Sequence, residues 1–184
     1  MSHQCFQTER LRLRQLTPAD AQLFYDLNND PEVLQYTGDQ PFASVADAKN
    51  FLENYGDYDN FGIGRWAIVL KGTQQTIGWC GLKYTAALHE VDLGFRLFRK
   101  EWGKGYATEA GIASLRYGFE VMQFEEIVGR VWKINLASQR VLEKCGLKFW
   151  KDAIFDEQAG SYYKITKSEY GARFSSPPQR DGYA

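Results

Sequence analysis

The first residues of the chain switch from the period of a strand to the period of a helix. Residues 10–16, RLRLRQL, place apolar and polar side chains at alternate positions, which predicts a half-buried strand. In the TPAD that follows, Thr17 is a helix cap, Pro18 suits the first helical position and Asp20 stands where a capping box needs an acid. Apolar residues then recur at helical spacing, as Ala21, Phe24, Tyr25 and Leu27. We therefore expect a strand followed by a helix.

Two more helices are predicted before residue 56. Asp30 and Pro31 repeat the signal of a cap followed by proline. A third helix should run from a Ser44 cap, with Asp47 three residues later, to about Tyr55.

From Trp66 the pattern becomes that of strands. Residues 66–84 form two β-type runs split by a polar turn that contains Gly72, which predicts an antiparallel hairpin. Residues 89–98, HEVDLGFRLF, form another run. It places Val91, Leu93, Phe95 and Leu97 on one face and Glu90, Asp92 and Arg96 on the other.

The second half of the chain alternates helices and strands. We expect a helix over residues 108–121, a strand over 125–132, and a helix that begins at Asn135 and stops at Gly146. Residues 147–155 and 161–170 complete a second hairpin, and residues 175–184 have the composition of a disordered tail. Without repeats or linkers, this order predicts a single α+β domain over residues 8–174, with a mixed, mostly antiparallel central sheet and flanking helices.

Composition removes several classes of function. With 22 Lys plus Arg against 23 Asp plus Glu, the chain lacks the field that would attract nucleic acid or an acidic membrane surface. No apolar run reaches the ~20 residues of a membrane span and the N-terminus has no signal core, so we expect a cytoplasmic protein. The three cysteines lack a CxxC spacing and the chain has only two histidines, so neither a disulfide framework nor a metal site is expected.

The stretch FRKEWGKGYATEAG, residues 98–111, has features typical of an anion-binding site. A strand that turns through Gly103 and Gly105 into a helix exposes backbone amides at the positive end of the helix dipole. A Walker loop is excluded because Lys104 is followed by Gly105 rather than Ser or Thr, and the dinucleotide fingerprint fails at Thr108. The alternative without function is an ordinary tight turn between strand and helix.

The remaining loop type, Q/R-x-x-G-x-G/A, resembles that of the GCN5-related N-acetyltransferases. The similarity extends from ERLRLRQLTPADA and DPEVLQYT through IGWCGL, VDLGFRL and EWGKGYATEA to NLASQRVLEKCGLKF and YYKITKSEY. Within the family, the chain resembles the branch that contains the ribosomal-protein alanine N-acetyltransferases. It departs from the motif at Lys100, where the family prefers Gln or Arg.

This resemblance implies that the protein binds acetyl-coenzyme A. The pyrophosphate would lie on the amides of the loop, and a splayed strand would pair with the pantetheine arm and offer an amide to the oxyanion, with Asn135 as a further contact to the arm. The implied cofactor-binding residues are Phe95, Arg96, Leu97, Trp102, Gly103, Lys104, Gly105, Tyr106, Ala107 and Asn135.

Acetyl transfer to an amine needs a neutral amine, a stabilised oxyanion and a proton for the thiolate. No spacing suggests a nucleophilic triad, so direct attack by the amine is expected. Ser138, one helical turn from Asn135, is our candidate for the proton donor, although it is equally an ordinary first-turn residue. Asp92 and Glu90 are candidate bases, or members of a solvated face with partners such as Arg96, and Glu157 is a third candidate.

The acceptor is left open by the sequence. A protein N-terminal amine, an amino acid, a polyamine and an aminoglycoside all fit, and a non-catalytic coenzyme A sensor is the alternative from another class. Asp57 and Asp59 either receive a cationic amine or form a solvated loop. A homodimer could form through an exposed strand of the C-terminal hairpin.

Overall fold

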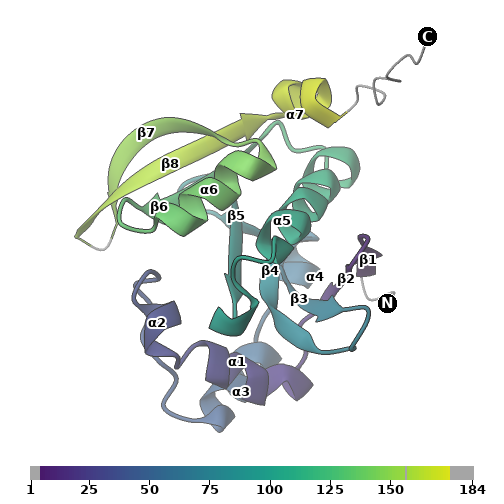
Figure 1. The fold of residues 1–184 in the computed structure, drawn as a ribbon, viewed down its shortest axis with the longest axis vertical. Coiled ribbons are helices and arrows are strands. Elements are labelled where there is room, and N and C mark those ends of the chain that lie inside the picture. Colours follow the sequence, from purple (N-terminus) through teal and green to yellow (C-terminus); the bar gives the residue numbers. More distant parts are fainter. Residues whose placement is uncertain (1–4, 156, 175–184) are drawn as a thin grey trace.

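One eight-stranded sheet organises the chain. The computed structural model describes residues 5–155 and 157–174 (Figure 1). The strands lie in the order β1-β2-β3-β4-β5-β6-β8-β7. Their bounds are β1 Cys5–Gln7, β2 Leu11–Gln15, β3 Arg65–Leu70, β4 Thr76–Thr85, β5 Glu90–Leu97, β6 Glu126–Trp132, β7 Lys148–Phe155 and β8 Gln158–Thr166.

All neighbouring strands in this sheet are antiparallel except β5 and β6. In the described part of the chain, these two share a single parallel register pair, Asp92 with Val128. By contrast, β4 and β5 stay in register from Gly78 with Leu97 to Thr85 with Glu90. The sheet is therefore almost divided between β5 and β6. The predicted α+β class, with a mixed and mostly antiparallel sheet, is confirmed.

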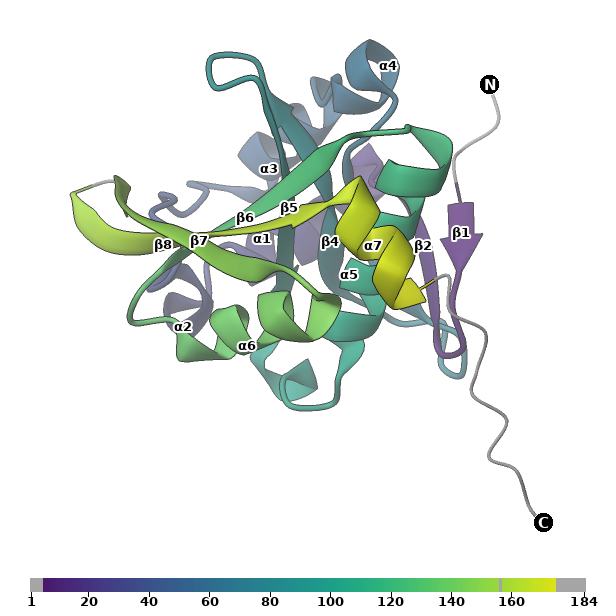
Figure 2. The ribbon, with the colours of Figure 1, turned by 90° about the horizontal axis from the view of Figure 1, so that it is seen from above.

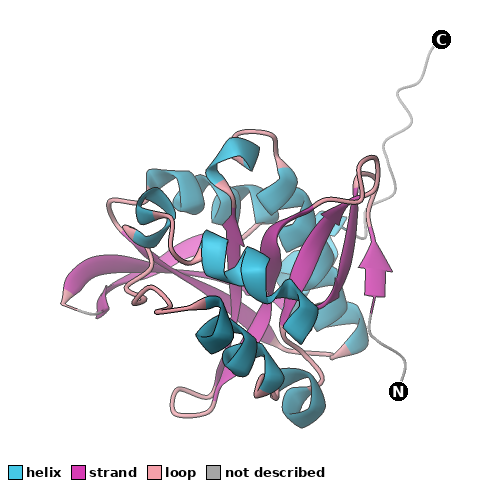
Figure 3. Cartoon of the chain, turned by 90° about the horizontal axis from the view of Figure 1, so that it is seen from below, coloured by secondary structure: helices cyan, strands magenta, loops and turns pink. Residues whose placement is uncertain are grey.

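Helices cover both faces of the sheet (Figures 2 and 3). In Figure 2, α1, α3 and α4 lie on one side and α5, α6 and α7 on the other. Their bounds are α1 Ala21–Leu27, α2 Pro31–Leu34, α3 Val45–Glu53, α4 Asp57–Phe61, α5 Tyr106–Arg116, α6 Leu136–Cys145 and α7 Lys167–Phe174.

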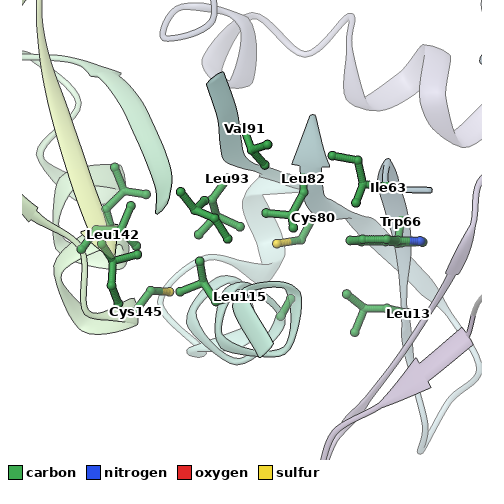
Figure 4. Packing of buried hydrophobic residues seen from close by; sticks show 14 of the residues in the cluster. Leu13, Ile63, Trp66, Cys80, Leu82, Val91, Leu93, Leu115, Leu142 and Cys145 are labelled. Carbon is green, nitrogen blue, oxygen red and sulfur yellow. The ribbon is translucent and has the colours of Figure 1, made fainter. Parts of the chain in front are cut away.

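The two faces have separate apolar cores. In the larger core, side chains from β2 to β5 meet those of α5 and α6, with Leu93, Leu115 and Leu142 all at most 2% exposed (Figure 4). The smaller core packs α1 and α3 against β3 through residues such as Phe24, Leu52 and Ala67. Because burial of apolar area dominates folding, these contacts hold the sheet and its helices as a rigid frame around the site.

Most predicted elements are present, and several bounds differ. Asp20 accepts a bond from the Thr17 amide as the capping box requires, but Pro18–Asp20 is only a 3₁₀ turn ahead of α1. The helix α5 begins at Tyr106, two residues earlier than expected, and α3 ends at Glu53.

The short elements β1, α4 and α7 were not predicted. Residues 57–61 were interpreted as an acidic loop and residues 167–170 as the end of a strand. The single-domain boundaries at residues 8 and 174 stay a prediction, and the expected tail, residues 175–184, lies outside the described residues.

Within the described residues, the structure has no helix that is both long and apolar enough to span a bilayer. Strand β7 lies at the edge of the sheet and exposes Phe149, Trp150 and Ile154. The predicted homodimer through this hairpin stays a prediction.

Candidate active site

A cleft of about 740 Å³ opens where β5 and β6 separate. It extends from the loop before α5, past the N-terminus of α6, to the polar face of β5. The structure places along it all of the predicted catalytic and cofactor-binding residues except Glu90, Lys104 and Glu157, namely Asp92, Phe95, Arg96, Leu97, Trp102, Gly103, Gly105, Tyr106, Ala107, Asn135 and Ser138. Residues that the sequence spreads over almost fifty positions thus share one cavity.

The wall formed by β5 offers a strand edge that β6 does not pair with beyond Asp92. The Phe98 amide donates to the Ile77 carbonyl at 3.1 Å, on the β4 side. Since alternate residues of a strand direct their backbone groups to opposite edges, Phe95 and Leu97 face the edge from which β6 has diverged. The Trp102 indole donates to the Leu97 carbonyl at 2.9 Å on that edge. An extended amide-bearing chain could pair with this strand as a neighbour strand would.

The loop before α5 presents its amides to the cleft. Gly103 and Gly105 have φ of 74° and 81°, values that glycine adopts without strain. In the described part of the chain, the amides of residues 103–108 donate to no carbonyl or side chain, and α5 has no side-chain cap. These unpaired donors at the positive end of a helix dipole are suited to a phosphate.

The back of this loop is fixed by Arg10 and Glu109. Arg10 donates through Nη1 to the Lys104 carbonyl at 3.0 Å and pairs with Glu109 at 2.6 Å, while its guanidinium lies 4.6 Å from the centre of the Tyr106 ring. Thr8 and the Arg10 amide donate to the same carboxylate, and these bonds lower the pKa of Glu109 against the effect of its burial. The Lys104 ammonium points to Glu101, at 3.0 Å, so only its amide is available to a ligand in this geometry.

The N-terminus of α6 forms the opposite wall. Asn135 caps the helix, because its Oδ1 accepts a bond from the Ser138 amide at 3.0 Å. Its side-chain NH₂ has no partner among the described residues, and neither does the Ser138 hydroxyl. Two polar groups are therefore available at the point where the two strands diverge.

Asp92 lies at the inner end of the cleft between two guanidinium groups. Its carboxylate accepts bonds from Arg65 at 2.5 Å and from Arg130 at 2.8 Å, and the residue is only 6% exposed. Burial alone would raise the pKa of Asp92, but the charges and hydrogen bonds of the two arginines lower it below the ordinary value. The expected solvated face with Arg96 as partner is wrong, because Arg96 instead pairs with Asp39.

The other two candidate bases lie outside the lining of the cleft. Glu90 accepts a bond from the Tyr162 hydroxyl at 3.4 Å, and the same hydroxyl contacts Arg130. A polar network therefore links Glu90 through Tyr162 and Arg130 to Asp92. Glu157 lies in the turn between β7 and β8, with φ of 63°, away from the cleft.

The mouth of the cleft near α2 is held by Arg96. Its guanidinium donates to Asn28 and, at 2.6 Å, to Asp39, and it lies 5.3 Å from the centre of the Trp79 ring. Tyr36 and Thr37, just after α2, line the cleft beside it. The segment after α2 is thus attached to the sheet through this arginine.

Sequence reasoning did not identify Arg10, Arg65, Arg130 or Glu109 as parts of the site. A signal was present for Arg130 and Arg65, since each occurs in a run that is otherwise apolar and buried. A charge in such a strand needs a partner of opposite sign. For Arg10 and Glu109, separated by 99 positions, the residue pattern gives no sign that they meet.

The sequence profile of the family described as Acetyltransferase (GNAT) domain matches residues 10–148. The uncharacterized N-acetyltransferase p20 of Bacillus licheniformis is 32% identical over 149 residues, which cover 80% of this chain and 83% of that protein.

Two solved structures share the fold at lower identity. The spermidine N-acetyltransferase of Vibrio cholerae, in complex with CoA and spermine, has a TM-score of 0.76 and 21% identity over 89% of this chain and 99% of that one. The ribosomal-protein-S5-alanine acetyltransferase of Vibrio fischeri has a TM-score of 0.77 and 16% identity over 91% and 98%. At these identities the likeness establishes the fold and no acceptor.

Proposed function

The chain belongs to the GNAT acetyltransferase family and is an N-acetyltransferase, and we propose that it transfers the acetyl group of acetyl-coenzyme A directly to a primary amine. The observation that carries the proposal is the set of unpaired amides at residues 103–108, beside the part of the β5 edge that is not paired with β6. The amides suit a diphosphate and the strand edge suits an amide-bearing arm, and both line one cleft.

The residues fit the parts of acetyl-coenzyme A in order along the cleft. The amides of residues 103–107 would hold the pyrophosphate, the β5 edge at Phe95 and Leu97 the arm, and the Asn135 side-chain NH₂ would donate to that arm. A main-chain amide on the free edge of the splayed strand, at Phe95 or Leu97, would stabilise the developing oxyanion.

Two protons move in the reaction. The Ser138 hydroxyl, which has no competing partner among the described residues, would protonate the departing thiolate. Glu90 is a better candidate than Asp92 for the proton of the incoming amine, because both arginines bind the Asp92 carboxylate and hold its pKa low. Asp92 would then position Arg65 and Arg130 rather than act as base.

The test measures acetyl-coenzyme A binding by calorimetry and free thiol release with a panel of amines. The panel includes Ala- and Ser-initiated peptides, so it also tests the predicted ribosomal-protein branch, whose support is the fold of distant neighbours. We expect binding without an acceptor and thiol release with at least one primary amine. A protein that binds the ligand and releases no thiol with any amine would be the non-catalytic sensor instead.

Gly105→Val checks that the loop is the binding element. A valine at φ of 81° is strained and its branched side chain obstructs the approach of a phosphate to the amides, so affinity should fall at least tenfold, or about 1.4 kcal/mol. Gly72→Val is the control, because an added Cβ at Gly72 meets no atom within 4 Å and the residue is remote from the cleft. Equal affinities in the two variants would count against the proposal.

A further inference from the structure

The end of the cleft around Asp92 and Arg96, which we call the acceptor end, carries more cationic than anionic groups. Arg65, Arg96 and Arg130 line it, and Asp92 is the acidic residue among them. Two carboxylates lie near this end without lining it: Asp39, which is 58% exposed on the outer side of Arg96, and Glu90, which accepts from Tyr162. Among the side chains that line this end, arginines therefore outnumber carboxylates.

The carboxylates that line the cleft are already engaged. Asp92 is paired with two arginines, and Glu101, the other lining carboxylate, is paired with Lys104 near the opposite end. Asp57, for which both a cationic amine and a solvated loop were considered, lines a separate hollow with Asp47 and Lys83. A polyamine, which carries several ammonium groups, would find no unpaired carboxylate on the described residues of this cleft.

Arg130 has donors to spare for an anion. A guanidinium carries five N–H groups, and this one contacts Asp92 and the Tyr162 hydroxyl while its side chain stays 28% exposed at the cleft. Its planar fork suits a carboxylate or a phosphate. An anion bound here would lie close to the network that contains Glu90, and therefore close to the candidate base.

We propose that the acceptor is a small primary amine that also carries an anionic group, as a free amino acid does, and that Arg130 binds this group. The inference rests on the proposed acetyl transfer and specifies its substrate class. A polyamine, an aminoglycoside and a peptide N-terminus, which has an amide in place of the adjacent anion, are the acceptors it excludes.

The test compares matched amines that differ only in the anionic group. Phenylalanine is compared with phenylalaninamide and phenethylamine, and O-phosphoethanolamine with ethanolamine, which separates a carboxylate from a phosphate as the recognised group. Thiol release should show kcat/KM at least about tenfold higher for the anionic member, the size expected of a charge-assisted contact. The amide has the less basic amine, so intrinsic reactivity would favour the opposite order. Equal or reversed preference, or reaction with peptides alone, overturns the proposal.

Variants of Arg130 locate the effect. Arg130→Gln should reduce the preference to less than about threefold, and Arg130→Lys, which keeps the charge without the fork, should retain part of it. Lys164→Gln is the matched control, a cation on β8 that pairs with Glu126 and does not line the cleft, and it should keep the full preference. An undiminished preference in a folded Arg130→Gln protein would contradict the assignment.

Measurements of acceptor binding test the proposed anion subsite independently of acetyl transfer. If no amine releases thiol, the acetyl-transfer proposal fails, and the same pairs are titrated into protein saturated with coenzyme A. Tighter binding of phenylalanine than of phenethylamine would then support the cationic subsite on its own, and equal binding would refute it.

Discussion

At the residue scale, Asn135 caps α6, and Ser138 is the candidate proton donor. Asn135 Oδ1 caps α6 through the Ser138 amide, which leaves the serine hydroxyl without a structural bond among the described residues. Ser138→Ala should therefore slow acetyl transfer by roughly a hundredfold or more, the usual contribution of a general acid, and leave affinity for acetyl-coenzyme A almost unchanged. Single-turnover rates and calorimetry separate the two quantities.

Ser168→Ala is the control for this substitution, because Ser168 is an exposed serine in the first turn of α7, remote from the cleft. Full turnover in the Ser138 variant would show that another group, or water, protonates the thiolate.

Asp92 should matter to folding because it neutralises two guanidinium groups at once. Asp92→Asn leaves Arg65, 15% exposed, without its carboxylate and should lower the free energy of unfolding by about 3–5 kcal/mol. Asp152→Asn, an exposed partner of Lys133, should change it by less than about 1 kcal/mol. Urea unfolding of both variants measures the difference.

The pH dependence of this loss follows from the sign of the pKa shift. The pKa of Asp92 is lower in the folded protein than the ~3.9 of an unfolded chain, so its stabilisation is fully present above that value. It is lost only as the pH falls through the lower, folded pKa. The difference in stability between the wild type and Asp92→Asn should stay constant from pH 7 to about pH 4.5 and narrow below it. A decline that begins near pH 6 would indicate another titrating group.

Residue patterns predicted the loop glycines, Asn135 and Ser138 because local backbone geometry and capping depend on near neighbours. Asp92 was predicted to be either a base or a member of a solvated face, but its environment depends on Arg65 and Arg130, which belong to other strands. Spacing within one strand cannot reveal such partners. The pairing of β3, β4, β5 and β6 decides which charges meet.

At the element scale, the loop before α5 depends on the turn between β1 and β2. Arg10→Ala removes the bond to the Lys104 carbonyl and the pair with Glu109, so the loop loses the brace behind its amides. The KM for acetyl-coenzyme A should rise on the order of tenfold. The KM for S-acetylpantetheine, which lacks the diphosphate, should not change, and a general loss of structure would raise both.

Arg12→Ala is a close control for this variant. Arg12 lies two positions later, in β2, and bonds Gln74 rather than the loop. Glu109→Gln should reproduce part of the Arg10 effect, since Arg10 would lose its charged partner. Identical behaviour of the Arg10 and Arg12 variants would contradict the positioning role.

The elements that sequence analysis missed differ in how visible they were. The helix α7 begins at TKSE, a capping box in which Glu169 accepts from the Thr166 amide at 3.0 Å and Thr166 accepts from the Glu169 amide at 3.3 Å. That signal was in the sequence, and the alternating pattern of β8 obscured it. The short elements β1 and α4 depend instead on tertiary contacts, such as the pairing of Phe6 with Leu13 in β2.

At the scale of the molecule, strand order was the part that local patterns could not give. The sequence predicted two hairpins and a mixed sheet, but β8 rather than β7 lies beside β6. The cleft exists because β5 and β6 meet in one register pair and then diverge. Such a divergence depends on packing of the two halves of the sheet against α5 and α6, whose contacts join distant segments.

This architecture predicts how the ligand affects the whole protein. Acetyl-coenzyme A would contact the β5 edge and the α5 loop on one half of the sheet and the α6 terminus on the other, so it should join two halves that few strand bonds connect. At a concentration one hundred times its Kd, the ligand should add about 2.7 kcal/mol of stability, which raises the Tm of a chain of this size by roughly 5–10 °C.

Hydrogen exchange distinguishes a ligand that joins the two halves of the sheet from one that binds only at the loop before α5. Amides of β6 and α6 should become protected together with those of the loop, because opening between the halves would require loss of the ligand. S-acetylpantetheine, which spans the divergence without reaching the phosphate loop, should protect β6 and α6 but not residues 103–108. Protection confined to the loop with acetyl-coenzyme A would mean that the ligand does not bridge the divided sheet.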